Sequence, residues 1–368
     1  MDKKLYWIWL TQIKGLGPIK IQNLLGYFKN AQGIWNASQE ELNNTPGIGS
    51  VLSTEIIETK KNFAPRKERE ELKKFSVELV TLEDKCYPKL LKEIYAPPPV
   101  LYYRGSLAAV NKPCIAVVGT RSCTQYGKRI AYSLSQELAK EGFVVVSGLA
   151  RGIDTRAHQG ALQRGMTYAI LGSGFKHLYP PENSQLADGI VGQGAVITPY
   201  HLRVEPSKSN FPARNRIISG LSLGTIVIEA PNKSGALITA NFSLRQGREV
   251  FAVPGDINHR QSQGTNKLIQ AGAKLVQDIE DIKEELVLDD FSLHRLNKKA
   301  NTEQQSNEIN LNQKQKVVYN LLNNEEQQFE KILSNVKMKA KELNSILSQL
   351  EIMGLIKQVS GKRFSTIT

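Results

Sequence analysis

Short apolar runs alternate with amphipathic stretches through the middle of the chain, and this alternation restricts the fold more than any other feature. The runs at 143–146 (FVVV) and 225–228 (TIVI) are apolar almost throughout, as expected for strands that are covered on both faces. Helical stretches such as 125–142 separate them, and helices between consecutive strands join parallel neighbours by right-handed crossovers. The pattern between 114 and 275 therefore predicts an α/β domain with a largely parallel sheet and helices on its faces.

The N-terminal part of the chain has a different pattern. Residues 1–65 predict short helices with glycine pairs at Gly15/Gly17 and Gly47/Gly49, the plan of paired helix-hairpin-helix motifs in a SAM-like domain. Such glycines let backbone amides approach an anion, although tandem hairpins also serve only for packing or protein contact. We expect the sheet domain to cover 66–288, with a charged helical connector at 66–76.

The C-terminal part divides into a linker and a small domain. Residues 289–312 are too polar to bury a core and predict a linker. Residues 313–368 predict three helices and a β-hairpin that turns at Ser360 and Gly361, the order of a winged-helix domain. Domains of this kind bind either nucleic acid or protein, and the residues leave both possibilities open.

The balance of charge favours a polyanionic partner. The chain has 48 Lys and Arg against 35 Asp and Glu, a net charge of +13. Nucleic acid is the first expectation and an anionic membrane surface the second, with a basic protein that binds no polyanion as the alternative. No apolar run reaches the roughly 20 residues of a membrane span, and no signal-peptide pattern is present. Three scattered cysteines without a CxxC pair favour a cytoplasmic protein without a metal site.

The ends of the predicted strands carry the candidate binding residues, because ligands of open parallel sheets lie beyond the C-terminal strand ends. Glycines admit a ligand to the backbone, and helix starts bind phosphates, although tight turns alone also need glycine. The chain has no Walker A run and no G-x-G-x-x-G after its first strand, so we expect neither ATP nor NAD as a cofactor. The candidates are Gly119, Thr120, Arg121, Ser147, Gly148, Arg151, Ser234 and Gly235.

The segment 208–220 (KSNFPARNRIISG) combines cations with an aromatic ring. These are the ingredients of a surface that neutralises phosphates and stacks a base. We expect Pro212 to stiffen a loop that carries the ring, and Asn215 to form a cap or to bond the bound strand. Two alternatives stay open, since Phe211 can belong to the core and Arg214 can pair with Glu229. The candidates here are Lys208, Phe211, Arg214, Asn215 and Arg216.

Catalysis has little support in the sequence. Asp154, His158 and Glu229 are the acid–base candidates near the strand ends. Asp154 is better explained as the N-cap of a helix, with His158 one turn later in a satisfied polar contact. Candidate serines at the strand ends lack a convincing His/Asp pattern. We therefore expect a protein that is not an enzyme.

Six longer stretches resemble one family. They are VVGTRSCTQYG, VSGLARGIDTRAHQGAL, LGSGFKHLYPPEN, NFPARNRIISGLS, SGALITANFSLRQGREVFAVPG and GTNKLIQAGA, in this order. Together they strongly resemble the DNA-processing protein A family (DprA, also called Smf). The resemblance is dense in the central domain and looser in the flanking domains.

The resemblance implies an extended Rossmann-like domain that binds single-stranded DNA without cleaving it. Family members form homodimers, protect incoming single strands and load the recombinase RecA onto them in natural transformation. The family's Gly-Ser-Arg motif corresponds to Gly119-Thr120-Arg121, where threonine keeps the hydroxyl, and its cation and base-contacting aromatic correspond to Lys208 and Phe211. By resemblance alone, the dimer face is expected around Leu268, Ile269 and Leu275.

Two other functions are alternatives to single-strand binding. Related Rossmann-like enzymes, such as phosphoribohydrolases, process nucleoside monophosphates and carry a Pro-Gly-Gly-x-Gly-Thr run before a catalytic glutamate. The chain has APNKSGALITA at the comparable strand end, and Glu229 precedes that turn. The other possibility is a scaffold that binds only proteins, which the cations at the strand ends argue against.

Overall fold

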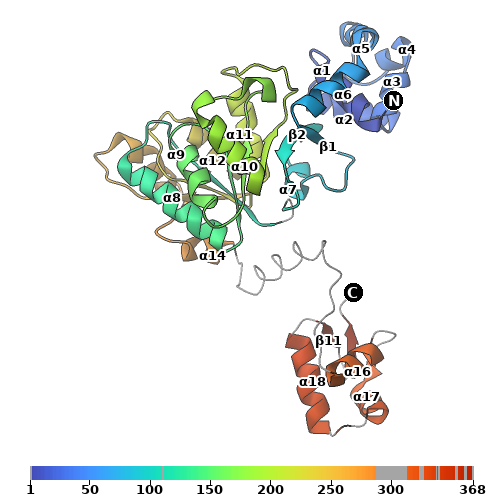
Figure 1. The fold of residues 1–368 in the computed structure, drawn as a ribbon, viewed down its shortest axis with the longest axis vertical. Helices are drawn as coiled ribbons and strands as arrows, with labels where there is room; N and C mark the ends of the chain where they lie inside the picture. The colour runs from blue at the N-terminus through green and yellow to red at the C-terminus, as the bar shows by residue number, and fades with distance from the viewer. Residues whose placement is uncertain are drawn as a thin grey trace. The chain divides into compact units, whose positions relative to one another are not determined.

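A computed structural model of the chain describes residues 2–109, 112–286, 313–322, 327–336, 338, 340–352, 355–359 and 363–366. Contacts divide the chain into two compact units, 1–301 and 302–368 (Figure 1). The predicted linker at 289–312 lies outside the described residues. Across the described parts of the chain, no helix has the length and apolar character that crossing a membrane requires.

The N-terminal helices pack around two buried tryptophans, Trp7 and Trp9. Glycines with positive φ stand in the two predicted turns, Gly15 at 79° before α2 and Gly47 at 82° before α5. The turns therefore lie where the sequence predicts them, while the helix-hairpin-helix assignment stays a prediction. The helices are α1 (Lys3–Gln12), α2 (Pro18–Phe28), α3 (Ala31–Asn36), α4 (Gln39–Asn43) and α5 (Ser50–Asn62).

A nine-stranded sheet with the order β1-β2-β6-β5-β4-β3-β7-β8-β9 forms the centre of the first unit. Strands β3 to β9 are parallel, and β1 and β2 add an antiparallel edge. The predicted Rossmann-like, mostly parallel sheet is thus confirmed. The strands are β1 (Glu78–Thr81), β2 (Val100–Gly105), β3 (Cys114–Val118), β4 (Val144–Ser147), β5 (Thr167–Ile170), β6 (Ala195–Thr198), β7 (Gly224–Val227), β8 (Glu249–Ala252) and β9 (Lys274–Leu275).

Helices cover both faces of the sheet because successive strand residues point to opposite sides. Ile115 and Val117 of β3 pack under α8 (Gln125–Lys140), α9 (Ile153–Ala161) and α14 (Glu280–Glu285). Ala116 and Val118 face the opposite layer. That layer contains α7 (Lys89–Lys92), α11 (Asn210–Gly220), α12 (Gly235–Arg245) and α13 (Gln263–Gln270), while α10 (Ser184–Gln193) packs on β5 and β6.

The predicted connector is a packed helix, α6 (Pro65–Lys74), held to the sheet domain by ion pairs. Glu68 is almost fully buried and lies 2.8 Å from His201 Nε2 and 3.1 Å from Arg203 Nη1. Glu71 pairs with Arg203 at 2.7 Å and with Lys176 at 2.8 Å. The three basic residues lie in loops that follow β5 and β6, so α6 fixes loops at the C-terminal edge of the sheet.

In the described residues of the second unit lie three helices and a pair of antiparallel strands, where the sequence predicts three helices and a hairpin. Its small sheet has the order β10-β12-β11, and Val318, Leu322, Leu343 and Leu350 lie in its core. The turn residues Ser360 and Gly361 lie outside the described residues, and the winged-helix assignment stays a prediction. The elements are α16 (Gln313–Leu322), β10 (Gln327–Gln328), α17 (Phe329–Asn335), α18 (Ala340–Ile352), β11 (Ile356–Val359) and β12 (Arg363–Thr366).

Candidate nucleic-acid interface

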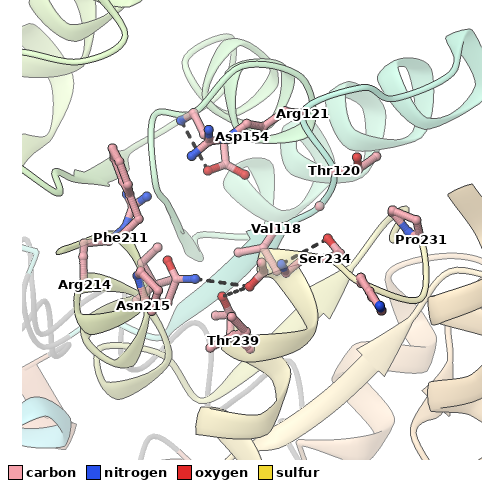
Figure 2. Close-up of a pocket in the computed structure, with 18 residues that line it drawn as sticks. Val118, Thr120, Arg121, Asp154, Phe211, Arg214, Asn215, Pro231, Ser234 and Thr239 are labelled. Atoms are coloured by element: carbon pink, nitrogen blue, oxygen red, sulfur yellow. Dashed lines mark hydrogen bonds between the residues drawn. The ribbon is translucent and has the colours of Figure 1, made fainter. Parts of the chain in front are cut away.

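The candidate site lies where the strand order reverses. The chain runs outward from β3 through β4, β5 and β6, then returns to place β7 on the other side of β3. Ligands of open α/β sheets bind at such a point, beyond the C-terminal strand ends. A cavity of about 290 Å³ opens there, lined by the turns after β3 and β7, by the start of α9 and by α11 and α12 (Figure 2).

The turn after β3 presents one exposed cation. The Thr120 amide donates to the Glu229 carbonyl at 2.8 Å, and a Cβ on Gly119 would lie 2.5 Å from Ile153. This packing fixes the backbone immediately before Arg121. The exposed guanidinium of Arg121 lies over the Phe211 ring, 5.3 Å from its centroid, and forms no ion pair with any described residue. Arg121 therefore keeps its charge available to an anion at the mouth of the cavity.

The helix starts of α8 and α12 both lie at this edge of the sheet, and a side chain of the protein occupies the start of α8. The buried carboxylate of Glu229 accepts from the Thr124 hydroxyl at 2.5 Å and from the Thr124 amide at 2.9 Å. A Cβ on Gly127 would overlap this carboxylate. The start of α8 thus holds an internal anion in the place where helix starts of this fold bind phosphate.

The second helix start, at α12, is open to the cavity. Ser234 caps the helix by accepting from the Ala236 amide at 3.3 Å, and nothing lies within 4 Å of a Cβ on Gly235. The Gly235 carbonyl accepts from Asn215 at 3.2 Å, which joins α11 to α12 (Figure 2). Lys233 also lines the cavity and is exposed. The candidates predicted from the sequence do not include Lys233, although its position beside Ser234 in a strand-end turn indicates a phosphate contact.

The predicted loop around Phe211 is instead the first turn of α11, which begins at Asn210. Pro212 fits there because residues of the first helical turn do not need their N–H groups for helix bonds. The half-buried ring of Phe211 lies 5.8 Å from the Tyr179 ring, and a Cβ on Gly172 would come within 2.7 Å of it. Phe211 is therefore packed along one side and borders the cavity with the other.

Helical geometry also separates the two arginines of this segment. Arg214 lies on the same side of α11 as Phe211 and lines the cavity from below. Arg216 is turned to the other side, where it donates to the Ala96 carbonyl at 2.6 Å. Lys208 lies exposed in the turn before α11 and is not among the residues that line the cavity. The segment therefore supplies residues to the cavity, to the opposite side of α11 and to the exposed turn before it.

A buried pair of opposite charges forms the floor of the cavity. The Arg214 guanidinium is 4% exposed and donates to the carbonyls of Gly148, at 2.5 Å, and Ile170. Burial lowers the pKa of Arg214 to about 10, opposed by the nearby Asp154 carboxylate. Asp154 accepts from the amides of Gly148 and Ala150, and burial raises its pKa against the opposing effect of Arg214. The floor is thus charged internally and largely screened from solvent.

This arrangement corrects two local interpretations. Gly152, with φ of 80°, is the N-cap of α9, whereas Asp154 lies inside the first turn and binds the preceding loop. The alternative pairing of Arg214 with Glu229 is not found, because Glu229 binds Thr124. Sequence spacing does not identify the partners of Asp154 and Glu229, since both depend on which loops meet in space.

Two further candidates from the sequence, His158 and Ser147, do not reach the cavity. His158 is fully buried; its Nδ1 donates to Thr167 Oγ1 at 2.7 Å, because that hydroxyl itself donates to the Val145 carbonyl. Burial lowers the pKa of His158 to about 3, with a further contribution from Arg214. Ser147 is also buried and donates to the Val117 carbonyl at 2.6 Å. Neither side chain is placed to act on a ligand in the cavity.

Other candidate residues lie around this centre or at the far edge of the sheet. Arg151 pairs with Glu182 and lines a smaller hollow that Phe211 also borders. Leu268 and Ile269 lie half-buried on α13, and Leu275 is 37% exposed on the edge strand β9. Within the described ranges, no group of three or more His, Cys, Asp and Glu side chains could hold a metal ion.

Comparisons with known proteins identify the family of the chain. The sequence model described as DNA recombination-mediator protein A matches residues 78–287. Protein Smf of Synechocystis sp. is 40% identical over 280 residues, covering 75% of this chain and 70% of the relative. DNA processing protein DprA of Bacillus subtilis is 45% identical over 212 residues, covering 57% of this chain and 71% of the relative.

Solved structures give the same result. The X-ray structure of DNA processing protein A from Streptococcus pneumoniae has a TM-score of 0.69 and 37% identity, covering 77% of this chain and 99% of that one. A structure of DNA processing protein A from Helicobacter pylori, described for its single-stranded DNA binding mode, has a TM-score of 0.52 and 32% identity. The match covers 57% of this chain and 96% of that one. By sequence and by fold, the chain belongs to the DNA recombination-mediator protein A family, also named DprA or Smf.

Proposed function

We propose that the chain binds single-stranded DNA at the β3/β7 edge of the sheet and does not cleave it. The observation that carries the proposal is the exposed Arg121 guanidinium lying over the Phe211 ring at the mouth of the cavity. A cation beside an aromatic face is suited to a strand whose phosphates and unstacked bases are both accessible. The description of the Helicobacter pylori relative supports the same ligand class.

The surroundings of Arg121 and Phe211 suggest how the strand is held. Lys233 and the open start of α12 offer further contacts for a phosphate across the cavity. Arg214 supports the floor without touching the strand, since its guanidinium is bound to carbonyls and lies beside the Asp154 carboxylate. The exposed Lys208, in the turn before α11, offers a further phosphate contact, whereas Arg151 would have to exchange its ion pair with Glu182 for one.

A catalytic role receives no support from the geometry. An enzyme that processes nucleoside monophosphates needs a carboxylate that reaches its ligand. Glu229 is 2% exposed and bound to Thr124, and Asp154 is bound to two backbone amides. We therefore favour binding over phosphoribohydrolase-like hydrolysis.

Membership of the family suggests the role of this binding in the cell. The protein would act as a cytoplasmic homodimer that protects incoming single-stranded DNA and loads RecA onto it in natural transformation. The β9 edge, with Leu268 and Ile269 on the adjoining α13 and an exposed Leu275, offers apolar surface for the dimer contact.

The test is a salt series of fluorescence anisotropy with a labelled single strand and a matched duplex. Arg121→Ala and the double variant Lys208→Ala/Phe211→Ala are compared with wild type and with Lys140→Ala, an exposed control at the far end of α8. Each lost phosphate contact should reduce the slope of log affinity against log salt by roughly 0.7. Weaker single-strand binding in both variants, with an unchanged control and an uncut oligonucleotide, supports the proposal. Wild-type affinity in both variants would refute it.

A further inference from the structure

We propose that the single strand continues from the cavity to a second binding groove on the other side of α11, an inference that rests on the proposed function. The groove has a volume of about 490 Å³ and lies between the first glycine turn of the N-terminal helices and the sheet domain. Its principal lining side chains are Pro18, Ile19, Lys20, Tyr95 and Arg216. We call it the α2–α11 groove.

Two sequence features that the first cavity does not use meet in this groove. One is the turn with Gly15 and Gly17, and the other is Arg216 of the basic segment. Arg216 donates through Nη1 to the carbonyls of Tyr95, at 3.4 Å, and Ala96, at 2.6 Å. Its Nε and Nη2 atoms have no bonding partner among the described residues. The arginine thus both fixes the Tyr95 loop and retains donors for an anion.

Tyr95 supplies the aromatic surface of the groove. Its side chain is 82% exposed, and the following Ala96 has a positive φ of 55°, so the loop presents the ring outward. The ring adds little to the protein's own core, because so little of it is buried. Held on a loop that Arg216 fixes, it offers a flat face on which a base can stack.

The charge of the groove matches a polyanion. Lys20 and Arg216 are its ionisable residues apart from the tyrosine, and no Asp or Glu lines it. Lys20 Nζ lies 3.3 Å from the Gly15 carbonyl, at the turn itself. The apolar side chains between the two cations suit bases, while the cations suit the phosphates on either side.

Helix α11 connects the groove to the first cavity. Arg216 follows Phe211 by five residues, which places it roughly 7.5 Å along the helix axis and about 140° around it. The two sites therefore lie on different sides of one helix, with the exposed Lys208 before its first turn. A single strand can bend around a helix, whereas a duplex, with a persistence length of about 150 base pairs, resists such a bend. The geometry accordingly points to single-stranded DNA.

The experiment is a length series of labelled single strands, from about 4 to about 16 nucleotides, the range of site sizes known for single-strand binding folds. The variants are Tyr95→Ala and Lys20→Ala. Both side chains are exposed, so neither substitution should disturb folding. Tyr27→Ala and Lys3→Ala are matched controls, because both residues are exposed on N-terminal helices and neither lines the groove. Arg216→Ala is added as a third variant, with a thermal melt to check the fold.

We expect the shortest strands to bind the variants and wild type equally, because they occupy the first cavity alone. The longest strands should bind Tyr95→Ala roughly 5- to 150-fold more weakly, the loss expected for one stacked base. Equal affinity of wild type and Tyr95→Ala at every length overturns the inference, as does a loss that appears only with duplex DNA. If wild type itself fails to bind single strands, the proposed function fails first, so the two failures are distinguishable.

Discussion

The floor and the rim of the β3/β7 cavity are built from similar residue types but differ in what satisfies them. On the floor, Arg214 and Asp154 are buried and bound to backbone groups of the protein. On the rim, Arg121 and Lys233 are exposed and lack ion pairs among the described residues. The difference teaches that charge alone does not identify a ligand contact. The floor joins α11 to the loop after β4 and to the end of β5, and the rim is left for the ligand.

The largest expected effect comes from Arg214→Met, which removes the cation of the floor. Asp154 would stay buried without its compensating charge, so we expect a loss of about 3–5 kcal/mol in the free energy of unfolding. Urea denaturation measures it. Arg121→Ala on the rim is the matched control and should change stability by less than about 0.5 kcal/mol. Equal losses in the two variants would contradict the division into floor and rim.

The buried His158 beside the floor should make stability depend on pH in a defined window. Its pKa of about 3 in the folded protein lies below the unfolded value of 6.5, so the unfolded chain binds more protons between them. Stability therefore falls as pH drops, by about 2–3 kcal/mol from pH 6.5 to pH 4.5, above the range where most carboxylates titrate.

Urea denaturation at a series of pH values tests this dependence. The control is His158→Asn, whose amide can still donate to Thr167 but does not titrate. The variant should lose most of the slope within this window. An identical slope in both proteins would show that other groups cause it.

A smaller effect distinguishes the two helix starts. Gly127→Ala places a methyl group against the Glu229 carboxylate and should destabilise the protein by about 1–3 kcal/mol. Gly235→Ala meets open space, and its stability should change by less than about 1 kcal/mol. Thermal melts measure both. For single-strand binding the order of the two effects should reverse. Gly235→Ala should weaken binding more than Gly127→Ala, because only the α12 start borders the cavity.

The fold could be predicted largely from the sequence because the strands are buried on both faces. Runs such as 143–146 leave no polar face, which excludes an exposed sheet, and the alternation with helices then implies parallel pairing. The two-residue strand β9 and the helix α10 were not predicted. β9 is too short to show a period, and α10 lies in a stretch whose turns and prolines hide the helical pattern.

The site could be predicted only as a set of strand-end turns. The sequence places Arg121 and Ser234 at the correct edge, since carboxyl strand ends share one side of a parallel sheet. It does not separate Arg214 from Arg216, because that separation requires knowing that α11 starts at Asn210 and not after Pro212. The exposure of each arginine then follows from helical periodicity.

The ion pairs between α6 and the loops after β5 and β6 bear on how this protein can be divided. A fragment that starts after α6 would leave Lys176, His201 and Arg203 without their carboxylates, in the loops that lead to Tyr179 and Lys208. It would also expose Leu171 and Leu202, which share a core with Trp7 and Trp9. Fusion proteins, truncations and chimeras made from this chain should therefore keep the N-terminal helices with the sheet that they cover.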